Sequence, residues 1–351
     1  DDAALTWFEE RPLLSLELLG KYARPGDPII DVGGGASRLA ESLLDAILFV
    51  SGRLQRDLGG SLIRPDTSND YNYRHNSNRR ALYWPVLRNS LPELFRVFDF
   101  ANPSMVTGRR IDADQGGHGV TWNTDQPGTT VHQAAGEEVG SVFARVHRAG
   151  GTTALFTGKS KFSLFQRSWP TAVDRFTLDT RGARLVRKAR KDLRRDTRTL
   201  TFLHLAAPDL AGHAHGWASS QYADAVRTVD GWLSDVLDTV ASKPVLRKHL
   251  TIVLTSDHGG SGTGHADATV REHYRVPFLT WGDGVDAEDL YALNPTYKKP
   301  RRKRPGYGAA RQPVRNGDVA NLALGLLGLR AIPGSTIGTD QDLVLTADAG
   351  E

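Results

Sequence analysis

The sequence predicts an α/β protein in which a mostly parallel sheet carries helices on both faces. From about residue 104 onward, short apolar segments of strand length alternate with longer segments that have the apolar spacing of helices. The connections between the apolar segments are long enough to hold helices, as parallel pairing requires. The length of 351 residues suits one large α/β domain or two smaller ones.

The first part of the chain is expected to form a helix, a strand, a glycine turn and a second helix. Residues 13–22 have helical apolar spacing, residues 28–32 form a short apolar strand, and residues 37–47 form the second helix. Three consecutive glycines at 33–35 connect the strand to that helix. A glycine turn at this place lets a ligand approach the backbone and the helix N-terminus.

The second part of the chain is expected to supply the sheet and most of its helices. Residues 48–103 show no clear period and are treated as a connecting region, with one helix at 87–97. The strands are expected at residues 152–156, 200–205, 250–255 and 276–281. The helices are expected at residues 141–147, 185–195, 222–240 and 318–327. The helix over 222–240 is amphipathic, because one face carries Ala225, Val229, Trp232, Val236 and Val240.

The composition is that of an ordinary globular protein, and it excludes several kinds of site. The chain has no Cys, which excludes disulfides, thiolate metal sites and cysteine nucleophiles. No apolar run approaches the roughly 20 residues that span a bilayer, and no signal peptide is visible, so the compartment is left open. Nine Lys and Arg lie between residues 181 and 198, and a second basic run covers 298–304. We interpret both runs as solvated surfaces, with no firm signal for a nucleic-acid or membrane partner.

Two of the apolar strands are each followed by side chains that can bind a metal ion. Asp209 and His213, four residues apart, are expected in a turn after the strand that begins at residue 200. Asp257, His258 and His265 follow the strand that begins at residue 250. Since ligands of open α/β sheets sit beyond the carboxyl ends of the strands, both groups are expected on one rim of the sheet. Carboxylates and imidazoles without thiolates suit zinc, and also manganese or iron.

Several motifs in the second part of the chain are specific in combination. They read SMVTGRR at 104–110, GHGVTWN at 117–123, PDLAGH at 208–213, SDHGG at 256–260, GH at 264–265 and QPVRNGD at 312–318. Through them, residues 104–345 resemble the alkaline phosphatase superfamily, in its type I phosphodiesterase/nucleotide pyrophosphatase branch. The resemblance implies an alkaline-phosphatase-like fold with two divalent ions, usually zinc, that act in a displacement at phosphorus. It implies one ion on Asp209, His213 and His265, and another on Asp257 and His258.

The chain departs from this family at the attacking hydroxyl and at one metal ligand. The family supplies a Thr or Ser nucleophile ten residues before the glycine that Gly108 matches, and that position here is Phe98. Ser104 and Thr107 carry hydroxyls and are the candidate substitutes. Ser61 stands where the opening strand of the family should end in a metal-binding Asp. The nucleophile and one metal ligand are therefore not identified by the resemblance.

Residues 5–47 resemble the opening of a different family, the class I S-adenosylmethionine-dependent methyltransferases. The motifs are WFEE at 7–10, SLELL at 15–19 and IDVGGGASRL at 30–39. The further strands that this family needs do not follow. In an alternative arrangement, the strand at 28–32 fills the missing first strand of the sheet and brings Asp31 to its rim as a metal ligand. We therefore divide the chain into a methyltransferase-like fragment, a connecting region and a hydrolase domain, at residues 1–47, 48–103 and 104–351.

These observations lead to one main hypothesis and two alternatives. The main hypothesis is a hydrolase of small anionic phosphate esters, of phosphodiesterase, nucleotide pyrophosphatase or phosphatase type, with two divalent ions, zinc first and manganese or iron next. Because Phe98 replaces the nucleophile, the first alternative is a metal-binding relative that is catalytically impaired. The second is an S-adenosylmethionine-dependent methyltransferase. Substrate identity and oligomeric state are left open. Lys161, Trp169 and Tyr274 could line a pocket, but we interpret them as core or surface residues. His215 lies beside the first group of ligands, and we interpret it as a residue that supports those ligands or as a surface residue.

Overall fold

The computed structural model describes residues 103–195, 198–265, 270–300 and 305–347. Contacts divide the chain into two units, Asp1–Phe98 and Asp99–Glu351, and every described residue belongs to the second. Several predictions therefore lie outside the described residues: the elements at 13–22, 28–32, 37–47 and 87–97, and the side chains of Asp31, Ser61 and Phe98. Among the described helices, none combines the length and apolar character needed to cross a bilayer.

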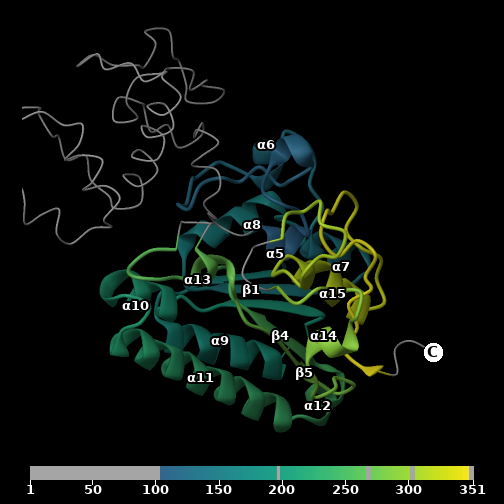
Figure 1. Ribbon diagram of the computed structural model, residues 1–351. Helices are drawn as coiled ribbons and strands as arrows, with labels where there is room; N and C mark the ends of the chain where they lie inside the picture. The colour runs from purple at the N-terminus through teal and green to yellow at the C-terminus, as the bar shows by residue number, and fades with distance from the viewer. Residues whose placement is uncertain (1–102, 196–197, 266–269, 301–304, 348–351) are drawn as a thin grey trace, which may run out of the picture. The chain divides into compact units, whose positions relative to one another are not determined.

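A three-stranded parallel sheet lies at the centre of the described unit (Figure 1). Its strands are β1 (Thr153–Thr157), β2 (Arg175–Leu178) and β3 (Leu200–His204), in the order β2-β1-β3. All five residues of the central strand β1 are buried. Leu155 pairs with Phe176 on one side and with Phe202 on the other. The parallel pairing confirms the predicted α/β class.

A second sheet has two strands, β4 (Thr251–Thr255) and β5 (Phe278–Gly282), which pair antiparallel. This pair is the antiparallel part of a fold that was predicted to be mostly parallel. A parallel connection needs a crossover that is usually a helix of some length. Between β4 and β5, the described residues form only the four-residue helix α13 (Arg271–Tyr274). No ladder joins β3 to β4 among the described residues.

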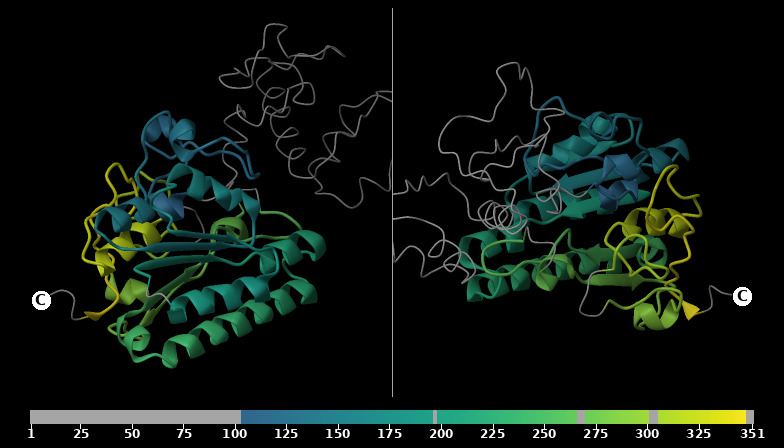
Figure 2. Two further views of the ribbon diagram at one scale, coloured as in Figure 1. Left: turned by 180° about the vertical axis from the view of Figure 1, so that it is seen from behind. Right: turned by 45° about the horizontal axis from the view of Figure 1, so that its top comes forward.

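Helices cover both faces of the parallel sheet, as predicted (Figures 1 and 2). Alternate residues of β1 point to opposite faces. Ala154 and Phe156 pack against α9 (Gly182–Arg195) on one face. Leu155 packs on the other face with residues of α7 (Val142–Arg148) and α8 (Ser163–Ser168). The alternation therefore places two separate hydrophobic clusters, one on each side of the sheet.

The long helix α11 (Ser220–Ala241) forms an outer layer against α9 (Figure 2). Its predicted apolar face points inward at two places. Val240 is fully buried beside residues of α9 and of α12 (Pro244–His249). Trp232 lies so close to Gly182 that a Cβ at that glycine would be 2.3 Å from the indole ring. A glycine at the start of α9 therefore allows the two helices to approach.

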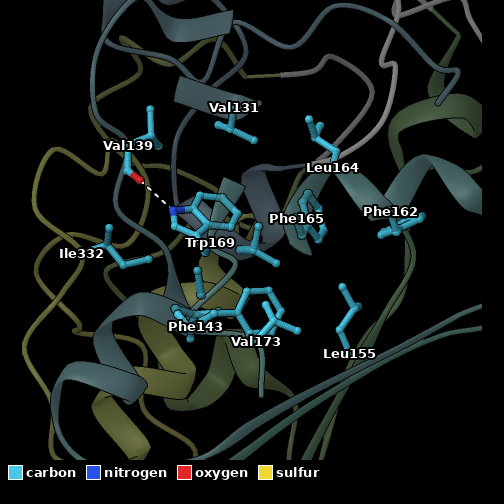
Figure 3. Packing of buried hydrophobic residues seen from close by; sticks show 14 of the residues in the cluster. Val131, Val139, Phe143, Leu155, Phe162, Leu164, Phe165, Trp169, Val173 and Ile332 are labelled. Carbon is cyan, nitrogen blue, oxygen red and sulfur yellow. Dashed lines mark hydrogen bonds between the residues drawn. The ribbon is translucent and has the colours of Figure 1, made fainter. Parts of the chain in front are cut away.

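The largest hydrophobic cluster lies between the parallel sheet and α7, α8 and α15 (Asp318–Leu326), and Figure 3 shows its centre. Phe143 is fully buried, with its ring centroid 6.5 Å from that of Phe165. Trp169 is buried here and donates a hydrogen bond from its indole nitrogen to the Val139 carbonyl oxygen at 3.0 Å. This contact confirms the reading of Trp169 as a core residue.

The predicted strands and helices between residues 141 and 327 are all present, with ends shifted by a few residues. The strand β2 and the helices α8, α12 and α13 were not predicted, residues 207–215 were expected as a turn and form a helix, and several other short elements were missed. These short elements are α5 (Ser104–Thr107), α6 (Val131–Ala135), α14 (Leu290–Leu293) and the 3-10 helices η2 (Ala113–Gln115) and η3 (Ser160–Phe162).

Candidate metal centre

The first group of candidate ligands lies on a helix rather than in the predicted turn. The helix α10 (Ala207–His215) begins soon after β3 ends. Pro208 occupies its first turn, where a missing backbone N–H costs no hydrogen bond. Because residues four apart share one face of a helix, Asp209 and His213 lie on the same side of α10. The helix therefore holds the pair more firmly than a turn would.

The second group follows β4, in a segment tied to neighbouring parts of the fold. Asn316 donates from its side-chain nitrogen to the carbonyl oxygen of Asp257 at 2.9 Å. The chain then forms a small bridge between Ser261 and Gly264, directly before His265. The side chain of His265 is buried, and its ring stacks on that of His258 with centroids 3.5 Å apart. The two imidazole rings are thus stacked face to face.

The two groups meet around one carboxylate oxygen. Asp209 Oδ1 lies 3.4 Å from His213 Nε2, 3.5 Å from His258 Nε2 and 3.8 Å from His265 Nε2. The Nε2 atoms of His213 and His265 are 3.2 Å apart. Asp257 Oδ2 lies 3.6 Å from His258 Nε2, so the structure brings all five of these predicted ligands close together. It places His258 beside Asp209 and His265, although the sequence analysis assigned His258 to the other ion.

Hydrogen bonds on the far side of two rings determine which nitrogen faces this group. His213 Nδ1 lies 2.9 Å from the Thr263 carbonyl oxygen, and His258 Nδ1 lies 2.9 Å from that of Gly259. A carbonyl oxygen only accepts, so each Nδ1 carries the proton, and in the neutral ring each Nε2 presents a lone pair. Asp209 Oδ1 is buried and has no hydrogen-bond partner among the described residues. Because His213 Nε2 accepts, the hydrogen bond between the two rings is donated by His265 Nε2, whose proton a metal ion would displace. Lone pairs of Asp209, His213 and His258 then face one point, where a cation can bind.

The distances in this group fit a metal ion. In a tetrahedral zinc site with bonds of about 2.0–2.2 Å, neighbouring ligand atoms are about 3.3–3.6 Å apart. The four separations given above, three to Asp209 Oδ1 and one between the Nε2 atoms of His213 and His265, span 3.2–3.8 Å. Ligand atoms of Asp209, His258 and His265 all lie within 4.8 Å of one another. Carboxylate and imidazole donors are also the set that suits a catalytic zinc, with His213 as a fourth donor or a neighbouring position left for substrate.

The electrostatic environment keeps these ligands in the forms that bind metals. Burial acts to raise the pKa of Asp209, but the contact with the Lys159 ammonium outweighs it, so the pKa lies below its usual value. Burial, with His258 as a second cause, lowers the pKa of His265 to about 3. Asp209 is therefore ionised and His265 neutral at physiological pH. Burial also lowers the pKa of nearby His204, to about 4.

The two candidate nucleophiles have their hydrogen bonds satisfied by their own surroundings. Thr107 is fully buried and donates to the Pro103 carbonyl oxygen at 2.8 Å. Ser104 Oγ lies 3.2 Å from His118 Nε2. His118 Nδ1 accepts from the Val120 amide at 3.1 Å, so its proton is on Nε2, which donates to Ser104. His118 in this form cannot act as a base for Ser104, and both hydroxyls stay predictions.

Lys159 is a site residue that the sequence analysis missed. It follows β1, and its ammonium contacts Asp209 Oδ2. The same rule that found the ligands, namely polar residues after apolar strands, also applies to Gly158-Lys159. A lysine is not a metal ligand in its charged form, so the search for carboxylates and imidazoles passed over it. Of the residues read as core or surface, Lys161 is buried and His215 is exposed.

The match to a protein-family model agrees with the motifs. A family model described as type I phosphodiesterase / nucleotide pyrophosphatase matches residues 66–312. A GPI ethanolamine phosphate transferase 1 from Yarrowia lipolytica is 34% identical over 104 residues, which cover 28% of this chain and 11% of the relative. The protein of the same name from Neurospora crassa is 30% identical over 173 residues, covering 45% and 16%. The matched part of this chain thus spans under a fifth of these relatives. The solved structure of murine ectonucleotide pyrophosphatase / phosphodiesterase 5 has a TM-score of 0.36 and 18% identity, over 47% of this chain and 46% of that one.

Proposed function

The chain belongs to the type I phosphodiesterase / nucleotide pyrophosphatase family, and we propose that it is a metal-dependent enzyme acting on small anionic phosphate esters. The observation that carries this proposal is the cluster of Asp209, His258 and His265 in the segments after β3 and β4, with His213 beside Asp209 and His265. Zinc is the first candidate, followed by manganese and iron. The family resemblance predicts two ions, and Asp257 is the remaining candidate ligand for a second.

The residues of the centre have distinct parts in this proposal. A divalent ion bound there would polarise a phosphoryl oxygen and stabilise the charge that develops on it. Asp209 and the imidazole nitrogens would hold the ion. Lys161, which is buried and donates to Asn123 Oδ1 at 2.6 Å, adds fixed positive charge that attracts an anionic ester. Ser104 and Thr107 are the protein hydroxyls proposed to attack phosphorus, with water as the other attacking group.

Whether the enzyme catalyses hydrolysis or transfer depends on the molecule that accepts the phosphate ester group: water or an alcohol. The two curated relatives described above are named as ethanolamine phosphate transferases, so their names describe transfer of a phosphate ester group. We propose hydrolysis as the activity to test first, because water is the acceptor present in every assay. Addition of an alcohol acceptor such as ethanolamine would reveal transfer as a second product.

The test combines metal content with turnover. Plasma mass spectrometry would measure metal per chain, and bis(p-nitrophenyl) phosphate and p-nitrophenyl phosphate would report diester and monoester hydrolysis. We expect bound zinc and measurable turnover in the native chain, and loss of both in Asp209→Asn. The exposed His215→Ala is the matched control and should change neither. Turnover that survives in Asp209→Asn without bound metal would contradict the proposal.

A metal-binding relative without turnover is the second candidate function. Two observations favour it: Phe98 stands at the nucleophile position of the family, and the Ser104 and Thr107 hydroxyls are engaged in hydrogen bonds. It predicts bound zinc and affinity for inorganic phosphate with no hydrolysis of either ester. Turnover that disappears in His213→Ala would rule it out.

The methyltransferase resemblance of residues 5–47 stays a prediction, since the matches reported above concern phosphodiesterases and transferases. Calorimetric titration with S-adenosylmethionine tests it directly. Micromolar binding would support a role for the glycine turn, and no binding would remove this alternative.

A further inference from the structure

The carboxylate of Asp209 is shared between two environments. Its Oδ1 atom faces the imidazole nitrogens, as described above. Its Oδ2 atom contacts the ammonium of Lys159. Both side chains are largely buried, with 21% of Lys159 and 17% of Asp209 exposed. A carboxylate that bridges two metal ions has the same arrangement, with one cation on each oxygen.

Lys159 is held in this position by the end of β1. Its backbone amide donates to Thr157 Oγ1 at 3.1 Å, and the same hydroxyl donates back to the Lys159 carbonyl oxygen at 3.1 Å. The 3-10 helix η3 begins at the next residue. Its backbone is therefore anchored beside the centre, unlike that of a surface lysine on a free loop.

A second divalent ion would have to share its ligands with the first. Asp257, which follows β4, has its Oδ2 atom 3.6 Å from His258 Nε2. The same His258 Nε2 lies 3.5 Å from Asp209 Oδ1, so this imidazole already faces the first ion. An ion placed at Asp209 Oδ2 would be repelled by the Lys159 ammonium that contacts this oxygen.

We propose that the ammonium of Lys159 takes the place of a second divalent ion, so that the centre binds one metal ion per chain. That ion contacts Asp209 Oδ1 and the imidazole nitrogens, while Lys159 neutralises Oδ2 and fixes the carboxylate. Lys159 is a positioning residue, since it acts through Asp209. This inference rests on the proposed function for the presence of a metal, and it differs from the two ions that the family resemblance predicts.

The test is metal stoichiometry in the full chain, by plasma mass spectrometry after dialysis and by calorimetric titration with zinc. Lys159→Met removes the charge and keeps nearly the same length, and Lys159→Arg is the matched control that keeps the charge. We expect about one zinc per native chain and per Lys159→Arg chain. We expect about two in Lys159→Met, with the first ion bound at least about tenfold more tightly because the carboxylate is no longer shared.

The outcomes separate this inference from the proposed function. Two zinc ions in the native chain, or one in Lys159→Met, would overturn the role of Lys159 and leave metal dependence intact. No zinc in the native chain would overturn the proposed function itself. If circular dichroism shows that Lys159→Met is unfolded, Lys159→Gln replaces it, and the native stoichiometry still decides by itself between one ion and two.

Discussion

Lowering the pH from 7 to 5 should destabilise this fold through His118, a histidine buried far inside the protein. Its side chain is completely excluded from solvent, with Nδ1 accepting from the Val120 amide at 3.1 Å. Burial, reinforced by the charge of Arg109, lowers the pKa of His118 to about 3. In the unfolded chain the pKa of a histidine is about 6.5. Between these values the unfolded state binds a proton that the folded state excludes.

The sign and size of the effect follow from this difference. The stabilisation is fully present above about pH 6.5 and is lost as the pH falls from 6.5 toward 3. In the pH range where this histidine is protonated only in the unfolded chain, the free energy of unfolding falls by about 1.4 kcal/mol for each pH unit. Integrated from pH 7 to pH 5, the loss from His118 is about 2 kcal/mol in the free energy of unfolding.

The assay is urea unfolding at several pH values for the native chain and for His118→Gln, which keeps a side-chain N–H for Ser104. The variant should be less stable at pH 7, but its stability should fall by about 2 kcal/mol less than that of the native chain between pH 7 and 5. His215→Gln at an exposed site is the matched control and should follow the native curve. Equal pH dependence in His118→Gln and the native chain would refute the reasoning.

Three further substitutions test the centre and the fold. His213→Ala should weaken zinc binding at least about tenfold in calorimetric titration, whereas exposed His215→Ala should not; equal affinities would remove His213 from the centre. Gly119→Ala should cost more stability in thermal unfolding than Gly136→Ala. Both glycines have positive φ, 69° and 73°, but only at Gly119 would a Cβ meet a backbone carbonyl of α6, at 2.1 Å; equal losses would argue against that close packing. Phe143→Ala should lower the free energy of unfolding by about 3–5 kcal/mol, because the ring is fully buried in the aromatic cluster; a loss below about 1 kcal/mol would argue against that burial.

The main strands and helices could be predicted because their sequences carry strong periodic signals. β1, β3 and β4 are rich in apolar residues, and α11 repeats apolar residues on one face. β2 has the sequence RFTL and partly exposed side chains, so the sequence has no apolar run here that would predict a strand. In α10, Pro208 and Gly212 are residues typical of turns, so the sequence predicted a turn at this place. In the structure Pro208 lies in the first turn of a helix, and Gly212 packs against Trp217.

The candidate site was predictable in its membership and not in its internal geometry. The rule about strand ends selected Asp209, His213, Asp257, His258 and His265 from the sequence. Which ring nitrogen faces the carboxylate depends on carbonyl groups of the 256–265 segment, and the sequence does not show where these lie. The contact of Lys159 with Asp209 joins residues 50 positions apart through the pairing of β1 with β3. Such contacts follow from tertiary packing rather than from local pattern.

The most direct measurement is anomalous diffraction at the zinc edge from crystals of the native chain grown with zinc. We predict a peak about 2.0–2.2 Å from Asp209 Oδ1 and from the Nε2 atoms of His258 and His265, where the segments after β3 and β4 meet. A zinc peak coordinated by other residues, or none under conditions where calorimetry shows zinc binding, would contradict the proposed metal centre.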